Sequence, residues 1–187
     1  QTRLLALATA ILVRPVLGVL TLIGLAVNKV WPAGMQRAHL DLIDRPLRLI
    51  RPLPGTTVHA EKLPHCPAEW VVAPPARDSD RVIVYFHGSA LVTLGLNSHR
   101  RFVSKLSEAT GAQVFNVGYR LAPQASIDEA IEDGLDAYRH VLSLGFAPDR
   151  VVFAGDGAAC AELARHAVEL LLRTTGTVAA AADLGDA

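Results

Sequence analysis

The stretch VFAGDGAAC, residues 152–160, takes the chain from a strand into a helix within a few residues. A β-branched and aromatic run ends at Gly155, Asp156 and Gly157, and small residues that open a helical pattern follow. The sequence therefore predicts a sharp strand-to-helix corner with Gly157 at its apex.

Strands and helices alternate on the amino-terminal side of this corner. Residues 81–86 form a nearly unbroken apolar run, typical of a strand buried on both faces. Further strands are predicted at 56–63, 69–73, 113–117, 150–154 and close to the last residues, 177–187, with the first two antiparallel. Helices are predicted over 98–110, 126–144 and 158–173, with Gly111 and Gly145 as helix stops and Ser126 with Glu129 as a capping box.

This order of elements predicts an α/β fold with a mostly parallel sheet and helices on both faces. The apolar spacing predicts which helical residues face the core. In the first helix these are Phe102, Val103, Leu106 and Ala109; in the second they are Ile127, Ala130, Ile131, Leu135, Tyr138 and Leu142; in the third they are Leu163, Ala167, Leu170 and Leu171.

The composition indicates a globular protein, with 51% hydrophobic residues and 18 acidic against 18 basic residues in a chain of 187. Because the charges balance, no overall field favours nucleic acid as a partner. We expect two parts: residues 1–55, an apolar and cationic helical arm or cap with a Pro-rich linker, and residues 56–187, a core that is incomplete at its carboxyl end. An incomplete sheet is expected to pair through its edge with the missing part or with another copy.

Arg14 and Pro15 divide the apolar part of the arm into residues 4–13 and 16–28, each shorter than the roughly 20 residues that span a bilayer. Two short helices that pack on the core, or lie at a membrane interface, fit this pattern better. Residues 3–51 are therefore a candidate for membrane-surface contact. The sequence leaves the compartment open between cytoplasmic and membrane-associated.

The two cysteines, Cys66 and Cys160, match no metal-binding spacing, and the seven histidines form no ligand pattern. We expect free thiols, no metal and no cofactor.

Three motifs follow the predicted parallel strands: His87-Gly88-Ser89-Ala90, the run YRLAPQ at 119–124, and Gly155-Asp156-Gly157-Ala158-Ala159. In this order and spacing they resemble the hormone-sensitive-lipase-like esterases of the α/β-hydrolase fold, whose motifs are HGGG, YRLAPE and GDSAGG. The resemblance covers about residues 56–184. In that family the segment ahead of the sheet contributes to a cap over the active site, a role that residues 1–50 could fill.

The resemblance implies the roles of the residues at these strand ends. Gly157 occupies the position of the nucleophilic serine at a strained strand-to-helix elbow, so the elbow carries no nucleophile. Glycine there is expected to relieve a torsional strain of about 1–3 kcal/mol that another residue would suffer. Backbone N–H groups of Gly88, Ser89 and Ala158 correspond to the oxyanion hole, and His87 and Asp156 shape or hydrogen-bond the neighbouring loop. The family's Asp and His are expected further downstream than the 30 residues that follow Gly157.

Other nucleophiles and bases fit less well. Ser89 belongs to the oxyanion loop without a base beside it, and Cys160 is better interpreted as a small core residue. His99, His140 and His166 fall on predicted helices among charged neighbours and are expected to be solvated.

Three functional hypotheses result. The first is an esterase-like or lipase-like domain that lacks its catalytic groups and retains a site for an acyl or ester small molecule. The second is a fragment or nucleophile variant of an active carboxylesterase. The third is a membrane-surface or protein-interaction module on a hydrolase scaffold.

Overall fold

The computed structural model describes residues 44–88, 94–122, 124–157, 165, 169 and 180–183. By its internal contacts the chain divides into two units, residues 1–39 and 40–187, and all described residues belong to the second. The predicted arm therefore lies largely outside the described residues, and the predicted boundary at residue 55 stays a prediction. Within the described ranges, no helix combines the length and apolar character needed to span a membrane.

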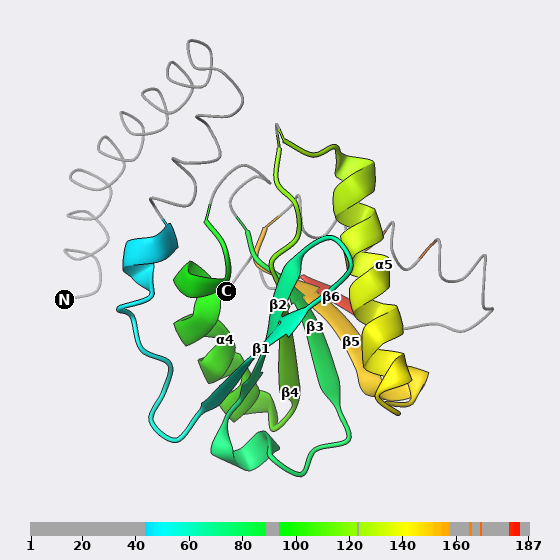
Figure 1. Ribbon diagram of the computed structural model, residues 1–187. Helices are drawn as coiled ribbons and strands as arrows, with labels where there is room; N and C mark the ends of the chain where they lie inside the picture. Colours follow the sequence, from blue (N-terminus) through cyan, green and yellow to red (C-terminus); the bar gives the residue numbers. More distant parts are fainter. Residues whose placement is uncertain are drawn as a thin grey trace, which may run out of the picture. The chain divides into compact units, whose positions relative to one another are not determined.

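A six-stranded mixed sheet forms the centre of the second unit, with strand order β1-β2-β4-β3-β5-β6 (Figure 1). Its strands are β1 (Thr57–Lys62), β2 (Pro67–Val72), β3 (Val82–Phe86), β4 (Gln113–Val117), β5 (Val151–Gly155) and β6 (Ala180–Asp183). β1 and β2 are antiparallel to each other, β2 is antiparallel to β4, and β4, β3, β5 and β6 are parallel. The predicted strands are confirmed. β6 is the outermost described strand, and pairing through its edge stays a prediction.

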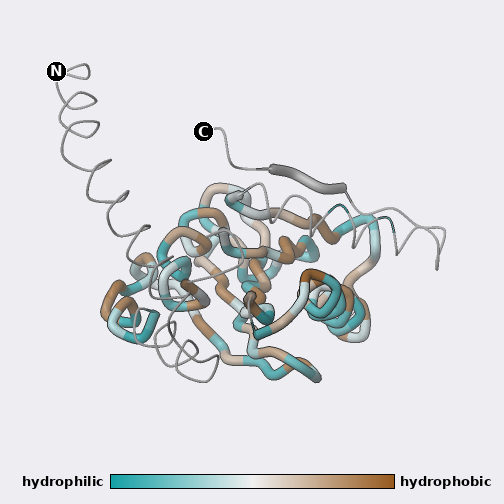
Figure 2. Tube along the Cα trace, turned by 90° about the horizontal axis from the view of Figure 1, so that it is seen from above, coloured by the Kyte–Doolittle hydropathy of each residue, from teal (hydrophilic) through white to brown (hydrophobic). Residues whose placement is uncertain are grey.

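Helices cover the two faces of the sheet, as predicted (Figure 1). α4 (Leu96–Thr110) packs on the face that carries Ile83, Val114 and Tyr85. α5 (Ile127–Ser143) packs on the opposite face and is amphipathic, with hydrophobic residues on one side and hydrophilic residues on the other (Figure 2). Two short 3₁₀ helices, η2 (Pro74–Ala76) and η3 (Pro148–Arg150), precede β3 and β5.

The predicted stops at Gly111 and Gly145 and the predicted capping box at Ser126 are confirmed. Gly111 follows α4 in the left-handed conformation with φ +61°, and Gly145 follows α5 with φ +97°, which glycine adopts readily. At the start of α5, the Ser126 hydroxyl accepts from the Glu129 N–H, and the Glu129 carboxylate accepts from the Ser126 N–H. α4 begins at Leu96, two residues before the predicted start.

The predicted core face of α4 is partly wrong. Phe102 and Ala109 are exposed, whereas Val103 is buried beside two serines that the apolar pattern overlooks. The Ser104 hydroxyl accepts from Leu53 N–H at 3.1 Å, and the Ser107 hydroxyl accepts from Ala73 N–H at 3.0 Å. These hydrogen bonds to buried backbone set the rotation of the helix.

Three other side chains also depart from prediction. Ile127 at the start of α5 is exposed. His99 is buried, and His140 is half-buried with its ring stacked 5.5 Å from that of Phe115, so neither is solvated as predicted. Both imidazoles pack against aromatic rings of the sheet, which a pattern of charged sequence neighbours does not reveal.

Cys66 is a buried free thiol, as expected from its spacing. Burial, with a further contribution from the Asp133 carboxylate, raises its pKa to about 12. The thiol is therefore protonated at neutral pH and a poor nucleophile.

Candidate functional site

The described residues of the three sequence motifs follow neighbouring parallel strands and lie at the carboxyl ends of these strands. β3 lies between β4 and β5, and Phe86 at the end of β3 is level with Val117 on one side and Gly155 on the other. Because these strands are parallel and end level, the residues that follow them lie next to one another. In sheets of this kind, ligands bind at the carboxyl ends of the parallel strands.

The loop after β3 is fixed by its own histidine. His87 is buried, its Nδ1 lies 3.1 Å from the Gly88 carbonyl oxygen, and its carbonyl accepts from the Tyr119 hydroxyl at 2.5 Å. Its ring stacks between those of Tyr119, at 4.5 Å, and His99, at 5.3 Å. Burial lowers the pKa of His87 to about 4, so this imidazole is neutral at physiological pH. The geometry suits loop shaping, the role that the resemblance implies.

Asp156 links the corner after β5 to the loop after β3. Its Oδ1 accepts from the Gly88 N–H at 2.5 Å, and its Oδ2 lies 3.2 Å from Nε2 of His99 on α4. Burial alone would raise the pKa of Asp156, but hydrogen bonds from His99, Tyr85 and Gly88 outweigh it and hold the pKa well below the usual range. Asp156 is therefore a carboxylate that fixes two loops and a helix together.

Asp156→Asn is expected to make the free energy of unfolding depend less steeply on pH in the acidic range. A depressed pKa in the folded state stabilises the protein above the ordinary Asp pKa of about 3.9, and this contribution is lost as the pH falls toward the folded-state value. Urea unfolding between about pH 5 and pH 2 should show that wild type loses more stability than Asp156→Asn. Asp78→Asn, at an exposed turn, is the control. Parallel acid limbs for wild type and Asp156→Asn would contradict this role.

The Gly88 N–H is thus directed at Asp156. The sequence assigns this N–H to an oxyanion hole, yet its single proton is engaged in the loop contact. The other predicted donors, Ser89 and Ala158, lie outside the described residues, as do Cys160, His166 and most of the helix predicted at 158–173. Their assignments stay predictions.

Gly157 lies directly after β5 and against the β3 loop. A Cβ built on Gly157 would be 3.6 Å from the Cα of Gly88, an ordinary van der Waals distance, and the φ of Gly157 is outside the left-handed range. The expectation that glycine relieves torsional strain here is therefore wrong. Nothing in the local backbone requires glycine at this position.

Gly88 is the glycine that the packing does require. A Cβ on Gly88 would come within 2.6 Å of the Asp156 carbonyl oxygen, closer than atoms can approach. Gly88→Ala is expected to push the two loops apart and to lower the free energy of unfolding by about 1–3 kcal/mol. Gly157→Ala, with its ordinary contact, is the matched control and should change stability by less than about 1 kcal/mol. Chemical denaturation of both variants tests this, and equal effects would contradict the close approach.

Sequence reasoning missed two residues of this site, His99 and Tyr85. Both lie on the α4 face of the sheet and interact with Asp156, His99 from α4 and Tyr85 from β3. Their separation in the chain from the corner left no local signal. The signal that could have revealed them is Asp156, because a half-buried carboxylate needs hydrogen-bond donors around it.

Comparisons with known proteins show which proteins this chain resembles. A family model described as alpha/beta hydrolase fold matches residues 83–182. Esterase LipU of Mycobacterium tuberculosis is 39% identical over 149 residues, which are 78% of this chain and 47% of LipU.

The chain belongs to the α/β-hydrolase family. Carboxylesterase/phospholipase LipF of the same organism is 40% identical over 122 residues, 64% of this chain and 33% of LipF. The crystal structure of an esterase from the bacterial hormone-sensitive lipase family aligns with a TM-score of 0.68 and 30% identity, over 83% of this chain and 52% of that one. This α/β hydrolase is thus of the hormone-sensitive-lipase-like type, and it spans about half the length of LipU.

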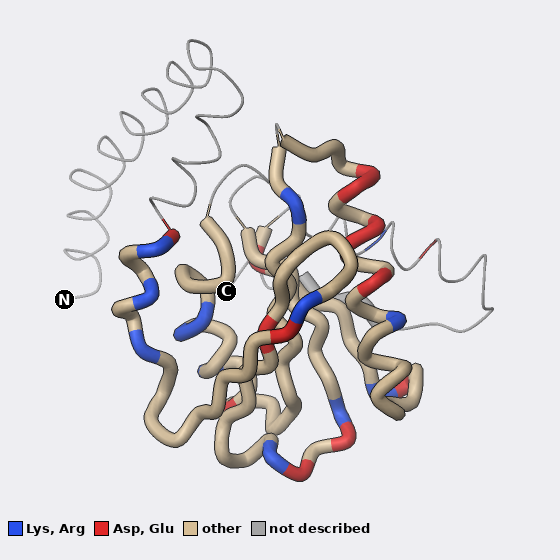
Figure 3. Tube along the Cα trace, in the orientation of Figure 1, with Lys and Arg blue, Asp and Glu red and all other residues tan. Residues whose placement is uncertain are grey.

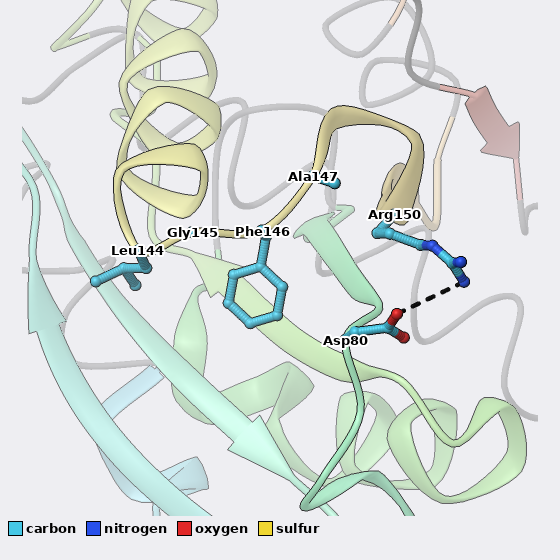
Figure 4. Close-up of a pocket in the computed structure, with 6 residues that line it drawn as sticks. All are labelled: Asp80, Leu144, Gly145, Phe146, Ala147 and Arg150. Carbon is cyan, nitrogen blue, oxygen red and sulfur yellow. Dashed lines mark ion pairs between the residues drawn. The ribbon is translucent and has the colours of Figure 1, made fainter.

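A hollow lies at the amino ends of strands β3 and β5. It has a volume of about 370 Å³ and is lined by Asp80, Arg150 and the 144–147 turn (Figure 4). Asp80 precedes β3 and Arg150 precedes β5, and their side chains form an ion pair of 3.7 Å. The hollow is therefore remote from the strand ends where the family motifs lie. Among the described residues, no group of three or more metal-ligating side chains is present.

Proposed function

We propose that this α/β hydrolase binds the acyl or carbonyl group of a carboxylic ester at the corner formed by Gly88 and Gly157, and does not cleave it. The observation that carries the proposal is Gly157 itself, which provides no hydroxyl at the position that the family's serine would occupy. The corner lies against the β3 loop, with a Cβ built on Gly157 at 3.6 Å from the Gly88 Cα, and this proximity supports a binding site there.

The described groups around the corner support an inactive site. The Tyr119 hydroxyl donates to the His87 carbonyl, and the Tyr85 hydroxyl interacts with Asp156. The two ring nitrogens of His99 contact Asp156 on one side and Ser98 on the other, at 2.9 Å. These contacts hold the two loops and the start of α4 together, a structural role that supports a site without an activated nucleophile.

Binding without cleavage can be measured directly. Equilibrium dialysis of the chain against p-nitrophenyl butyrate, followed by chromatography, should recover intact ester from the protein side, and Gly88→Ala should reduce the amount retained. If the ester is not retained by the folded wild-type chain, the proposed binding function is wrong.

A second candidate is an esterase whose nucleophile position has been changed to glycine. The room for a Cβ at Gly157, together with the resemblance to proteins named as esterases, favours it. Under this candidate, Gly157→Ser restores ester hydrolysis in a chain that also carries the family's downstream Asp and His. Under the first candidate it does not.

A further inference from the structure

The segment ahead of β1 is held along the outside of α4. The Asp44 carboxylate accepts from the N–H groups of Asn97, at 3.3 Å, and Ser98, at 3.0 Å, and so caps the helix. Arg101 donates to the Arg51 carbonyl at 3.0 Å, and Ser104 accepts from Leu53 N–H. These contacts therefore hold residues 45–51 at a defined position beside α4.

The exposed side chains of residues 45–51 are both cationic and apolar. Residues 45–51, RPLRLIR, contain three arginines and no acid, and the basic positions are blue along the segment ahead of β1 in Figure 3. Arg101 and Lys105 on α4 are exposed as well. Between the arginines, Leu49 is 84% exposed and Ile50 is 41% exposed. Asp44, which directly precedes these residues, is hydrogen-bonded to the amino-terminal end of α4. The exposed acid of α4 is Glu108, three residues after Lys105.

We propose that residues 45–51, with Arg101 and Lys105, dock the protein on an anionic lipid bilayer. Arginine binds phosphate oxygens in two-point contacts, and Leu49 and Ile50 can enter the boundary between headgroups and acyl chains. Nucleic acid would satisfy the cations and leave both apolar side chains in water, which is why a lipid surface fits better. The proposal is independent of whether the corner at Gly157 binds an ester.

Co-sedimentation of the full chain with vesicles tests the proposal. Binding is expected with mixed phosphatidylcholine and phosphatidylglycerol, little with phosphatidylcholine alone, and less as salt rises. Arg48→Gln with Arg51→Gln should lower the partition coefficient roughly 25-fold, or about fivefold per charge. Leu49→Ser with Ile50→Ser should lower it roughly tenfold or more at unchanged charge.

Matched controls separate this surface from general effects. Lys62→Gln with Arg139→Gln removes two exposed charges elsewhere, and Ile127→Ser with Leu144→Ser removes two exposed apolar side chains from α5 and its end. Both controls should bind as wild type, with circular dichroism showing that every variant is folded. The proposal is overturned if wild type does not bind anionic vesicles, or if the variants of residues 48–51 bind as well as the controls. Equal binding to a DNA duplex that survives Leu49→Ser with Ile50→Ser would also overturn it.

Discussion

This chain is expected to hydrolyse p-nitrophenyl butyrate about 10⁶-fold more slowly than a family esterase that carries serine at the corner after β5. Without the nucleophile, no acyl-enzyme forms. The remaining rate enhancement, about 10³–10⁴ over the uncatalysed reaction in water, comes from substrate binding and oxyanion donors. Gly157 provides backbone only, and the nearby tyrosine hydroxyls and His99 are engaged with their neighbours.

Initial rates with and without the chain measure this residual activity. Ser89→Ala and Cys160→Ala are the informative controls, because those two residues carry the remaining candidate nucleophiles near the motifs. Clear turnover that disappears in either variant would show that another side chain has taken over the reaction.

Gly157→Ser separates the two candidate functions. The added Cβ fits at 3.6 Å from Gly88, so the variant should fold, and its stability should match that of Gly157→Ala. Turnover is measured in a chain that also carries the family's downstream Asp and His, because a serine without them stays inactive. A rise by several orders of magnitude would support the changed-esterase candidate. Unchanged turnover in a folded variant would support the ester-binding domain.

Arg100→Ala is expected to lower the free energy of unfolding by about 3–5 kcal/mol. Glu69 on β2 is only 3% exposed, and its carboxylate accepts from the Arg100 guanidinium at 2.7 Å and from the Asn116 amide at 3.0 Å. Removing the cation leaves a buried carboxylate without a counter-charge, which costs far more than the loss of a surface pair.

The contrast with a surface pair gives the control. Arg139 is 61% exposed and lies 3.3 Å from Asp136, so Arg139→Ala should cost no more than about 1 kcal/mol. Urea unfolding of both variants, with Glu69→Leu plus Arg100→Leu as a third, measures the difference. The double variant should recover much of the lost stability, because it leaves no charge behind. A cost of less than about 1 kcal/mol for Arg100→Ala would contradict the buried pair.

The strands and the helix ends could be predicted because their signals are local. Apolar runs such as 82–86 and capping residues such as Ser126 and Gly111 act on their own neighbourhood in the chain. The face that α4 buries could not be read from apolar spacing, since Ser104 and Ser107 set it through bonds to distant backbone. Such contacts depend on the folded arrangement.

The same distinction holds for the candidate site. The residues that follow the strands were identified from their order, because parallel strands bring their ends together. The partners of Asp156 were missed, since His99 was expected to be solvated among its charged sequence neighbours. The torsion at Gly157 was predicted wrongly for a related reason: family resemblance suggests strain, while the actual backbone shows room for a side chain.

Intact mass spectrometry of the chain after incubation with a reactive p-nitrophenyl phosphonate tests the central claim most directly. Such reagents form stable adducts with activated nucleophiles. A corner without a nucleophile predicts an unchanged mass under conditions that modify a family esterase completely. Stoichiometric modification of the folded chain would show that an activated nucleophile is present, and would contradict the account.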